Sequence, residues 1–162
     1  MRDEDYMRMA LDIARDAATR GEIPVGAVVV KDGQVIARAG NEKERQEDAT
    51  AHAEILALQR AARQLGSWRM QEATLYCTLE PCPMCAGAMV NVRLGRLVYS
   101  TRDPKAGAAG SILDIVRCPA FNHQVMVEDG VLKEECAELL SAFFADLRRD
   151  GREVEGARLE IE

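Results

Sequence analysis

Four residues in the middle of the chain have the types and the spacing of a metal centre. His52 and Glu54 belong to a His-Ala-Glu triplet, and Cys82 and Cys85 belong to the segment PCPMC. Two cysteines at i and i+3 of a helix start project to the same side, where the N–H groups of the first turn favour thiolates. Imidazole nitrogen and thiolate sulfur are ligands that zinc prefers in proteins. The spacing therefore predicts a zinc site formed by His52, Cys82 and Cys85.

A site with three protein ligands predicts catalysis. The fourth tetrahedral position of zinc is then left to water, as in catalytic sites and not in structural ones. Zinc lowers the pKa of that water to about 7, so that hydroxide is available at neutral pH. Glu54 lies two residues from His52, and we expect it to shuttle protons and not to bind the metal. HxE combined with PCxxC is the signature of zinc-dependent nucleobase deaminases, which replace an amine on a heterocyclic carbon by hydrolysis.

The sequence leaves other interpretations of the cysteines open. A lone CxxC is also typical of a redox pair or of half a structural zinc site. Further ligands of such a site would come from Cys77, Cys118, Cys136 and His123. We expect Cys77 to be a packed thiol in a strand. Cys118 and Cys136 are expected to be free cysteines, and no chemistry is assigned to His123. Because five is an odd number of cysteines, a disulfide framework is disfavoured.

Periodicity indicates the elements that must hold these residues. Apolar residues at helical spacing predict helices over residues 3–19, from 50 or 51 to 65, and over about 83–92, 111–116 and 131–149. Apolar and β-branched segments predict strands over residues 24–30, 34–40, 73–79, 96–101 and about 124–128, the first two joined at Asp32-Gly33 as a hairpin. Because helices alternate with strands after the hairpin, we expect an α/β fold with a mixed sheet and helices on both faces.

Two loops have compositions that bear on function. Residues 41–50 are polar and aperiodic, which is typical of a solvated surface loop. Residues 102–110 are rich in glycine and alanine, and the length of this loop suggests a binding role and not a mere connection.

Length and composition favour one soluble domain. The chain has 162 residues, 48% of them hydrophobic, which is enough to bury a core without disulfides. Its longest apolar run, Val25–Val30, is far shorter than the ~20 residues of a membrane span. The N-terminus lacks the apolar core of a signal peptide, so we predict a single cytoplasmic domain over residues 1–162, with a frayed acidic tail at 151–162. The net charge of −6 disfavours indiscriminate nucleic-acid binding but is compatible with a specific RNA held by a local basic patch.

Several longer segments carry a closer resemblance. They are GEIPVGAVVV, TAHAEILAL, ATLYCTLEPCPMCAGAM, RDPKAGAAGS, FNHQV and GVLKEECAELLSAFF, which follow one another between residue 21 and about residue 149. In these segments the chain resembles the bacterial tRNA-specific adenosine deaminases of the cytidine-deaminase-like superfamily. The resemblance implies a three-layer α/β/α sandwich with a central five-stranded mixed sheet, one zinc ion per subunit and a homodimer.

The same resemblance implies a reaction and a substrate. Adenosine at the wobble position of a tRNA anticodon loop would be deaminated to inosine. Zinc-bound hydroxide would attack carbon 6 of the base, Glu54 would shuttle protons, and ammonia would be released. We expect no DNA partner and no membrane.

Substrate-binding residues near the base are also implied by the resemblance. Asn41 corresponds to an asparagine that contacts the flipped base, with a turn or a helix cap as its alternative role. Asp103 and Lys105 correspond to positions beside the RNA backbone, where an aspartate that accepts from a ribose 2′-hydroxyl would favour RNA over DNA. Arg102 would add positive charge there, and a solvated loop is the alternative for these three residues.

The last helix is the second region that the resemblance assigns to RNA. Phe144, Arg148 and Arg149 correspond to positions that hold the anticodon stem-loop, and core packing is the alternative for Phe143 and Phe144. The chain ends in EVEGARLEIE and not in the lysine-rich tail that is frequent in the family, so RNA affinity must come from the body. The candidate cations are Arg93, Arg96, Arg102, Lys105, Arg148 and Arg149.

Two other functions remain open from the sequence. A deaminase of a free base or nucleoside, such as guanine or cytidine, would keep the zinc chemistry and suit the acidic net charge. An RNA-binding or interaction domain stabilised by a structural zinc ion would need four protein ligands, and Glu54 would then have no role. The stretch MCAGAMVNVRLG offers small apolar residues for a homodimer interface, with packing on the sheet as the alternative.

Overall fold

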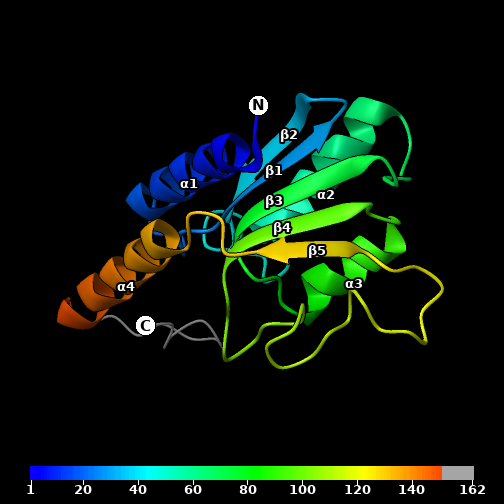
Figure 1. Cartoon of the computed structure of the whole chain (residues 1–162). Coiled ribbons are helices and arrows are strands. Elements are labelled where there is room, and N and C mark those ends of the chain that lie inside the picture. The colour runs from blue at the N-terminus through cyan, green and yellow to red at the C-terminus, as the bar shows by residue number, and fades with distance from the viewer. Residues whose placement is uncertain (151–162) are drawn as a thin grey trace.

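The chain is built around a mixed sheet of five strands (Figure 1), and the computed structural model describes residues 1–150. Along the chain the strands are β1 (Gly26–Lys31), β2 (Gln34–Gly40), β3 (Ala73–Leu79), β4 (Arg96–Thr101) and β5 (Met126–Asp129). They lie side by side in the order β2-β1-β3-β4-β5. β1 is antiparallel to β2 and β3, whereas β3, β4 and β5 are parallel to one another. The acidic tail predicted at 151–162 lies outside the described residues.

The hairpin between β1 and β2 forms where the sequence predicts it. Asp32 and Gly33 make the two-residue turn, and both have positive φ angles, 52° and 73°. Two consecutive positive φ angles are what the tight hairpin turn of a twisted ribbon requires, and Asp-Gly adopts them at low cost. The hairpin prediction is confirmed.

Helices cover both faces of the sheet. Over the described residues they are α1 (Asp3–Thr19), α2 (Ala53–Leu65), α3 (Pro83–Asn91) and α4 (Lys133–Arg149). Figure 1 shows α1 and α4 on one face and α2 and α3 on the other. This arrangement confirms the predicted three-layer α/β/α sandwich. None of these helices within residues 1–150 combines the length and the apolar character that crossing a membrane requires.

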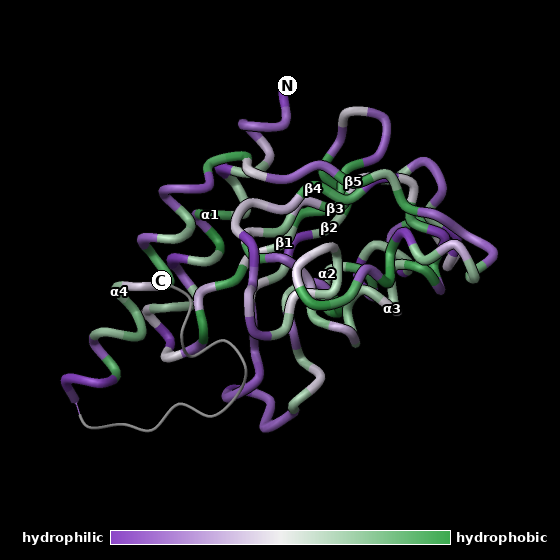
Figure 2. The backbone as a smooth tube through the Cα atoms, turned by 60° about the horizontal axis from the view of Figure 1, so that its bottom comes forward, coloured by the Kyte–Doolittle hydropathy of each residue, from purple (hydrophilic) through white to green (hydrophobic). Residues whose placement is uncertain are grey.

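Alternation along the strands explains the two layers of core. In β1, Val28 and Val30 pack with Tyr6 and Met7 of α1. The intervening residue Val29 belongs to the larger core under α2 and α3. Successive side chains of a strand point to opposite faces, so an unbroken apolar strand is what a sheet covered on both sides requires. In Figure 2 the hydrophobic residues concentrate in the strands, and the loop between β2 and α2 is hydrophilic.

Several elements differ from the sequence-based expectations, and the differences at α2, at the fifth strand and at residues 111–116 bear on the site. Helix α2 begins at Ala53 and not at residue 50 or 51, and the fifth strand spans 126–129 and not 124–128. The helix predicted over 111–116 is absent from the structure of the described residues, where this segment is a loop with a single bridge between Ala109 and Asp114. The amides of Ile112 and Leu113 bond to the carbonyl of Gly107, so they are not available for helical hydrogen bonds.

Candidate metal centre

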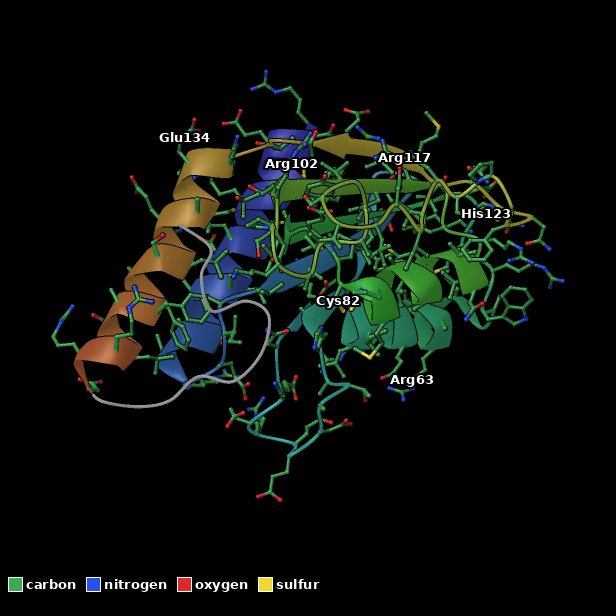
Figure 3. The ribbon with its side chains drawn as sticks, turned by 90° about the horizontal axis from the view of Figure 1, so that it is seen from below. Arg63, Cys82, Arg102, Arg117, His123 and Glu134 are labelled. Atoms are coloured by element: carbon green, nitrogen blue, oxygen red, sulfur yellow. The ribbon has the colours of Figure 1, made fainter. Side chains whose placement is uncertain are left out.

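Two helix starts bring the predicted metal ligands together. His52 is the residue that precedes α2, and Cys82 precedes α3, which follows β3 almost directly. Pro83 occupies the first turn of α3, where its missing N–H is not needed. Cys85 lies three residues after Cys82 and faces the same side. Figure 3 shows Cys82 at the start of α3, beside α2.

The geometry of the three side chains fits a zinc ion. The Sγ atoms of Cys82 and Cys85 are each 3.6 Å from Nδ1 of His52, and the ligand atoms all lie within 4.8 Å of one another. Nitrogen and sulfur ligands at about 2.1 and 2.3 Å from a tetrahedral zinc are separated by about 3.6 Å. The three atoms are therefore spaced as zinc requires. Within residues 1–150 no fourth His, Cys, Asp or Glu joins the cluster.

The electrostatics of the cluster favour a thiolate. The pKa of the Cys82 thiol is lowered to about 3, mainly by a hydrogen bond with Cys85 and further by His52, although burial acts in the opposite direction. A deprotonated cysteine is the form that binds zinc. The donor set of one imidazole and two cysteines, at helix starts that favour negative charge, thus matches a metal site.

Glu54 lies beside the cluster in the first turn of α2 and is fully buried, with 0% of its surface exposed. It is not a member of the ligand group. A carboxylate held next to a metal site without binding the metal is positioned for proton transfer. Within the described residues, three protein ligands and a nearby buried acid form a catalytic arrangement rather than a structural one.

Asn41 holds the start of α2. Its Oδ1 accepts a hydrogen bond from the amide of Ala53 at 2.8 Å, and its Nδ2 donates to the carbonyl of Ile23 at 3.0 Å. His52 itself makes no side-chain cap, so the distant asparagine replaces it in that role and leaves the imidazole to the cluster. The alternative of a helix cap, raised from the sequence, is therefore what the free protein displays.

Comparisons with known proteins give the family. The family of MafB19-like deaminases matches residues 1–148. The tRNA-specific adenosine deaminase of Bacillus subtilis (strain 168) is 49% identical over 147 residues, which are 91% of this chain and 91% of that protein. The chain belongs to the tRNA-specific adenosine deaminase family. The family member of Haemophilus influenzae is 46% identical and covers 98% of this chain and 91% of its own length.

Solved structures agree with this family. A structure from a study of A-to-I editing by tRNA deaminases at the wobble position has a TM-score of 0.81 and 46% identity, covering 84% of this chain and 99% of that chain. The guanine deaminase from Nitrosomonas europaea is less similar, with a TM-score of 0.73, 26% identity and coverage of 86% and 83%. The deaminase fold predicted from the resemblance is confirmed.

The glycine-rich loop after β4 is ordered by its own contacts. Asp103 is buried, and its Oδ1 accepts from the amides of Lys105 and Ala106 at 3.0 and 3.1 Å. Lys105 is exposed. Arg102 is also exposed and pairs with Asp129 at 3.0 Å. For Asp103, the alternative of a solvated loop residue is therefore wrong, whereas contact with RNA stays a prediction for all three residues.

Two residues that sequence analysis placed against RNA lie elsewhere in the deaminase. Phe144 is 2% exposed and its ring packs in the hydrophobic core, the alternative that the sequence left open, so the structure corrects its assignment as an RNA contact. Arg96 pairs with Asp3 at 2.6 Å and with Glu128 at 2.8 Å, which ties the start of α1 to the sheet. Arg148 is exposed on α4 and stays a predicted contact.

The remaining cysteines and His123 lie outside the metal cluster. Cys77 and Cys136 are buried and Cys118 is half-buried, and none of the three forms a disulfide within the described residues. Burial raises the pKa of the Cys136 thiol, so this cysteine stays protonated. His123 contacts the carbonyl of Leu94 through Nε2 at 2.6 Å.

Sequence analysis missed two buried acids near the site. Glu22 is buried and accepts from the amides of Glu44 and Arg45 at 3.0 and 2.8 Å. Glu80 is buried two residues before Cys82 and contacts the glycine-rich loop. A signal for both was present in the sequence, since each acid adjoins an apolar strand segment, GEIPVGAVVV for Glu22 and TLYCTLEPC for Glu80. An acid at the end of a buried strand is itself expected to be buried and to need hydrogen-bond partners.

Proposed function

We propose that the protein converts adenosine to inosine at the wobble position of a tRNA anticodon loop. The observation that carries the proposal is the cluster of His52, Cys82 and Cys85 beside buried Glu54, in a chain 49% identical to a tRNA-specific adenosine deaminase. We assign one zinc ion per subunit to the cluster. When bound, zinc acts as a Lewis acid that lowers the pKa of a water molecule to about 7.

The proposed part of Glu54 is proton transfer. Its carboxylate takes a proton from the attacking water and gives it to N1 of the base, then takes the remaining hydroxyl proton and gives it to the exocyclic amine, which leaves as ammonia. Adenosine and water thus give inosine and ammonia, and the carboxylate ends in the state in which it began. Because Glu54 has no exposed surface, it exchanges protons with the bound substrate and not with bulk water.

We also propose how the substrate is held. Asn41 has two amide protons and two lone pairs, and its contacts with Ala53 and Ile23 use one of each, so the others remain for the base. Lys105 and Arg148, both exposed, supply positive charge for phosphates. Asp103, which orders the loop by accepting from the amides of Lys105 and Ala106, is proposed to accept also from a ribose hydroxyl. An adenosine in a single-stranded loop reaches such a site at a cost of only a few kcal/mol.

A homodimer is the proposed assembly. Helix α3 has half-buried small and flexible residues on one side, Met84, Gly87 and Ala88, and a side chain at Gly87 would meet nothing within 4 Å. This face gives a second copy room to approach closely. Sedimentation velocity at micromolar concentration is expected to give a dimer, and a monomer would contradict this assembly. With tRNA as substrate, the proposed location is the cytoplasm.

The decisive experiment is a nucleoside assay by mass spectrometry. Zinc-loaded protein is incubated with an anticodon stem-loop that has adenosine at the wobble position, and with a second stem-loop in which that adenosine is moved along the loop. Inosine is expected from the first RNA alone. Glu54→Gln is expected to make none while it retains one zinc per chain. Glu72→Gln, the same change on an exposed side chain (76%) just before β3, is the matched control and is expected to act like the wild type.

Free guanine and cytidine belong in the same assay. The similarity to guanine deaminase, at 26% identity, is the specific observation that favours this second candidate. Release of ammonia from free guanine or cytidine, without inosine from either RNA, would show that the substrate is a free base or nucleoside and would refute the RNA proposal. Activity retained by Glu54→Gln would instead refute the proton-transfer role.

A further inference from the structure

Glu80 is a buried carboxylate that the proposed reaction does not use. It follows β3 directly and precedes Pro81 and Cys82, and none of its surface is exposed. A buried acid is costly unless hydrogen bonds satisfy it. The groups that satisfy Glu80 therefore indicate why an acid stands at this position.

Within residues 1–150, all the donors that the structure gives to Glu80 come from the glycine-rich loop and from Ser111, which follows it. Oε1 accepts from the amide of Asp103 at 3.0 Å and from the hydroxyl of Ser111. Oε2 accepts from the amides of Ala109 and Ser111, both at 3.0 Å. One carboxylate thus binds both ends of residues 103–111 and closes the loop on itself.

The loop is also seated on the segment that holds the metal ligands. The amide of Ala108 donates to the carbonyl of Pro81 at 2.8 Å, one residue before Cys82. A side chain at Gly107 would lie 2.4 Å from Cδ of Glu80 and 2.5 Å from the carbonyl of Asp103. Only glycine allows the loop to approach the carboxylate this closely, so the contact is tightly packed as well as hydrogen-bonded.

We propose that Glu80 is a positioning residue, which fixes the loop 103–111 against the metal centre so that Asp103 and Lys105 stand ready for the substrate. The substrate part of this inference rests on the proposed RNA deaminase function. The attachment of the loop to Glu80 does not, and it is measured independently of activity.

The charge and both oxygens of Glu80 are needed for this role. An amide in the same place has one oxygen and one NH2 group. The hydroxyl of Ser111 can turn to accept from that NH2, but in either orientation of the amide at least one backbone N–H faces a donor in Glu80→Gln. Hydrogen bonds to an ionised group are the stronger ones. Glu80→Gln is nearly isosteric, so it loosens the loop without leaving a cavity.

Hydrogen exchange followed by mass spectrometry tests the attachment. In zinc-loaded Glu80→Gln, amides of residues 103–111 are expected to exchange at least about tenfold faster than in the wild type, as loss of one charge-assisted hydrogen bond implies. Exchange in α3 should stay unchanged. Glu22→Gln is the matched control, because this buried carboxylate accepts from the amides of Glu44 and Arg45 in the loop between β2 and α2. This variant should speed exchange at residues 44 and 45 and not at 103–111. Unchanged exchange at 103–111 in Glu80→Gln would overturn the inference.

Kinetics with the wobble-adenosine stem-loop separate positioning from mere stability. Glu80→Gln is expected to raise KM about tenfold, with kcat and zinc content close to wild type. Ser111→Ala, which removes one donor, should raise KM less and add little in the Glu80→Gln background. A fall in kcat at constant KM, or loss of zinc, would assign Glu80 to fold stability and overturn the inference. If the wild type makes no inosine, the proposed function fails, while the exchange result still decides the attachment.

Discussion

The replacement of Asn41 by alanine tests how the start of α2 is held. Asn41 lies at the end of β2, on the other side of a loop from the helix that it caps. It is 5% exposed, and its two side-chain hydrogen bonds reach Ala53 and Ile23. Because Ala53 lies between His52 and Glu54, this single side chain fixes the backbone that carries a member of the metal cluster and the acid proposed for proton transfer.

The magnitude follows from the two bonds. Loss of an asparagine cap costs about 1 kcal/mol. Loss of the hydrogen bond to the carbonyl of Ile23, which still accepts from the amide of Val25, costs about 1 kcal/mol more. The expected loss in the free energy of unfolding is thus about 2 kcal/mol, which lowers the Tm of a chain of this size by about 4–8 °C. Asn41→Asp retains the acceptor for Ala53 and places a negative charge at a helix start, where charge of that sign is favourable. The Asn41→Asp variant should therefore lose less of the free energy of unfolding than Asn41→Ala, about 1 kcal/mol.

Thermal and urea unfolding of the zinc-loaded variants provide the assay. Zinc content is measured on the same samples, since zinc binding itself raises the Tm. Asn41→Ala should be the less stable variant, and Asn41→Asp should lie between it and the wild type. A change below about 0.5 kcal/mol in Asn41→Ala, within the range of an ordinary surface substitution, would refute the capping role.

Three further measurements address the metal, the ion pairs and the last helix. A zinc chelator should abolish inosine formation and lower the Tm, and added Zn²⁺ should restore both; activity that survives full zinc loss contradicts the assignment. The guanidinium of Arg96 lowers the pKa of the Asp3 carboxyl below its usual 3.8. The stabilisation of the fold by the ion pair of Asp3 and Arg96 is therefore complete at neutral pH. It is lost as the pH falls below about 4 toward the lowered pKa of Asp3. Asp3→Asn should cost about 1 kcal/mol in urea unfolding at pH 7, and its deficit should shrink at pH 3. Phe144→Ala should lose about 3–5 kcal/mol of stability. Arg148→Ala should unfold as the wild type does and should raise KM for RNA. The opposite result for the two variants would contradict the assignment of Phe144 to the core.

Local sequence signals predicted most of the elements and the metal cluster. Asp32-Gly33 placed the hairpin because the turn residues alone determine its backbone, and apolar periodicity placed α1 and β3 within a residue of their bounds. The ligands could be found because two of them share one helix turn, and the third begins another helix. Such patterns depend on neighbours in the sequence, and a single chain displays them directly.

Other features depend on contacts between distant segments, and these the sequence did not predict. The segment 111–116 has an acceptable helical pattern, but its amides are engaged by Gly107 and by Glu80. Phe144 and Arg96 were read as RNA contacts because type and position in the chain do not reveal burial. The start of α2 was placed early because its cap, Asn41, directly follows β2 and is not one of the residues that adjoin the helix.

The two acids that were missed show why such contacts escape a reading of the sequence. Glu22 and Glu80 each hold a loop at the border of the site mainly through backbone amides. Every residue except proline offers a backbone N–H, so the loop residues need no matching side chain, and no pairwise pattern appears in the sequence. Attachment through backbone amides does not use the side chains of the loop, and Lys105 is exposed. The order of these loops is therefore set by Glu22 and Glu80, which lie outside them, whereas the substrate contacts proposed above come from residues on the loop itself.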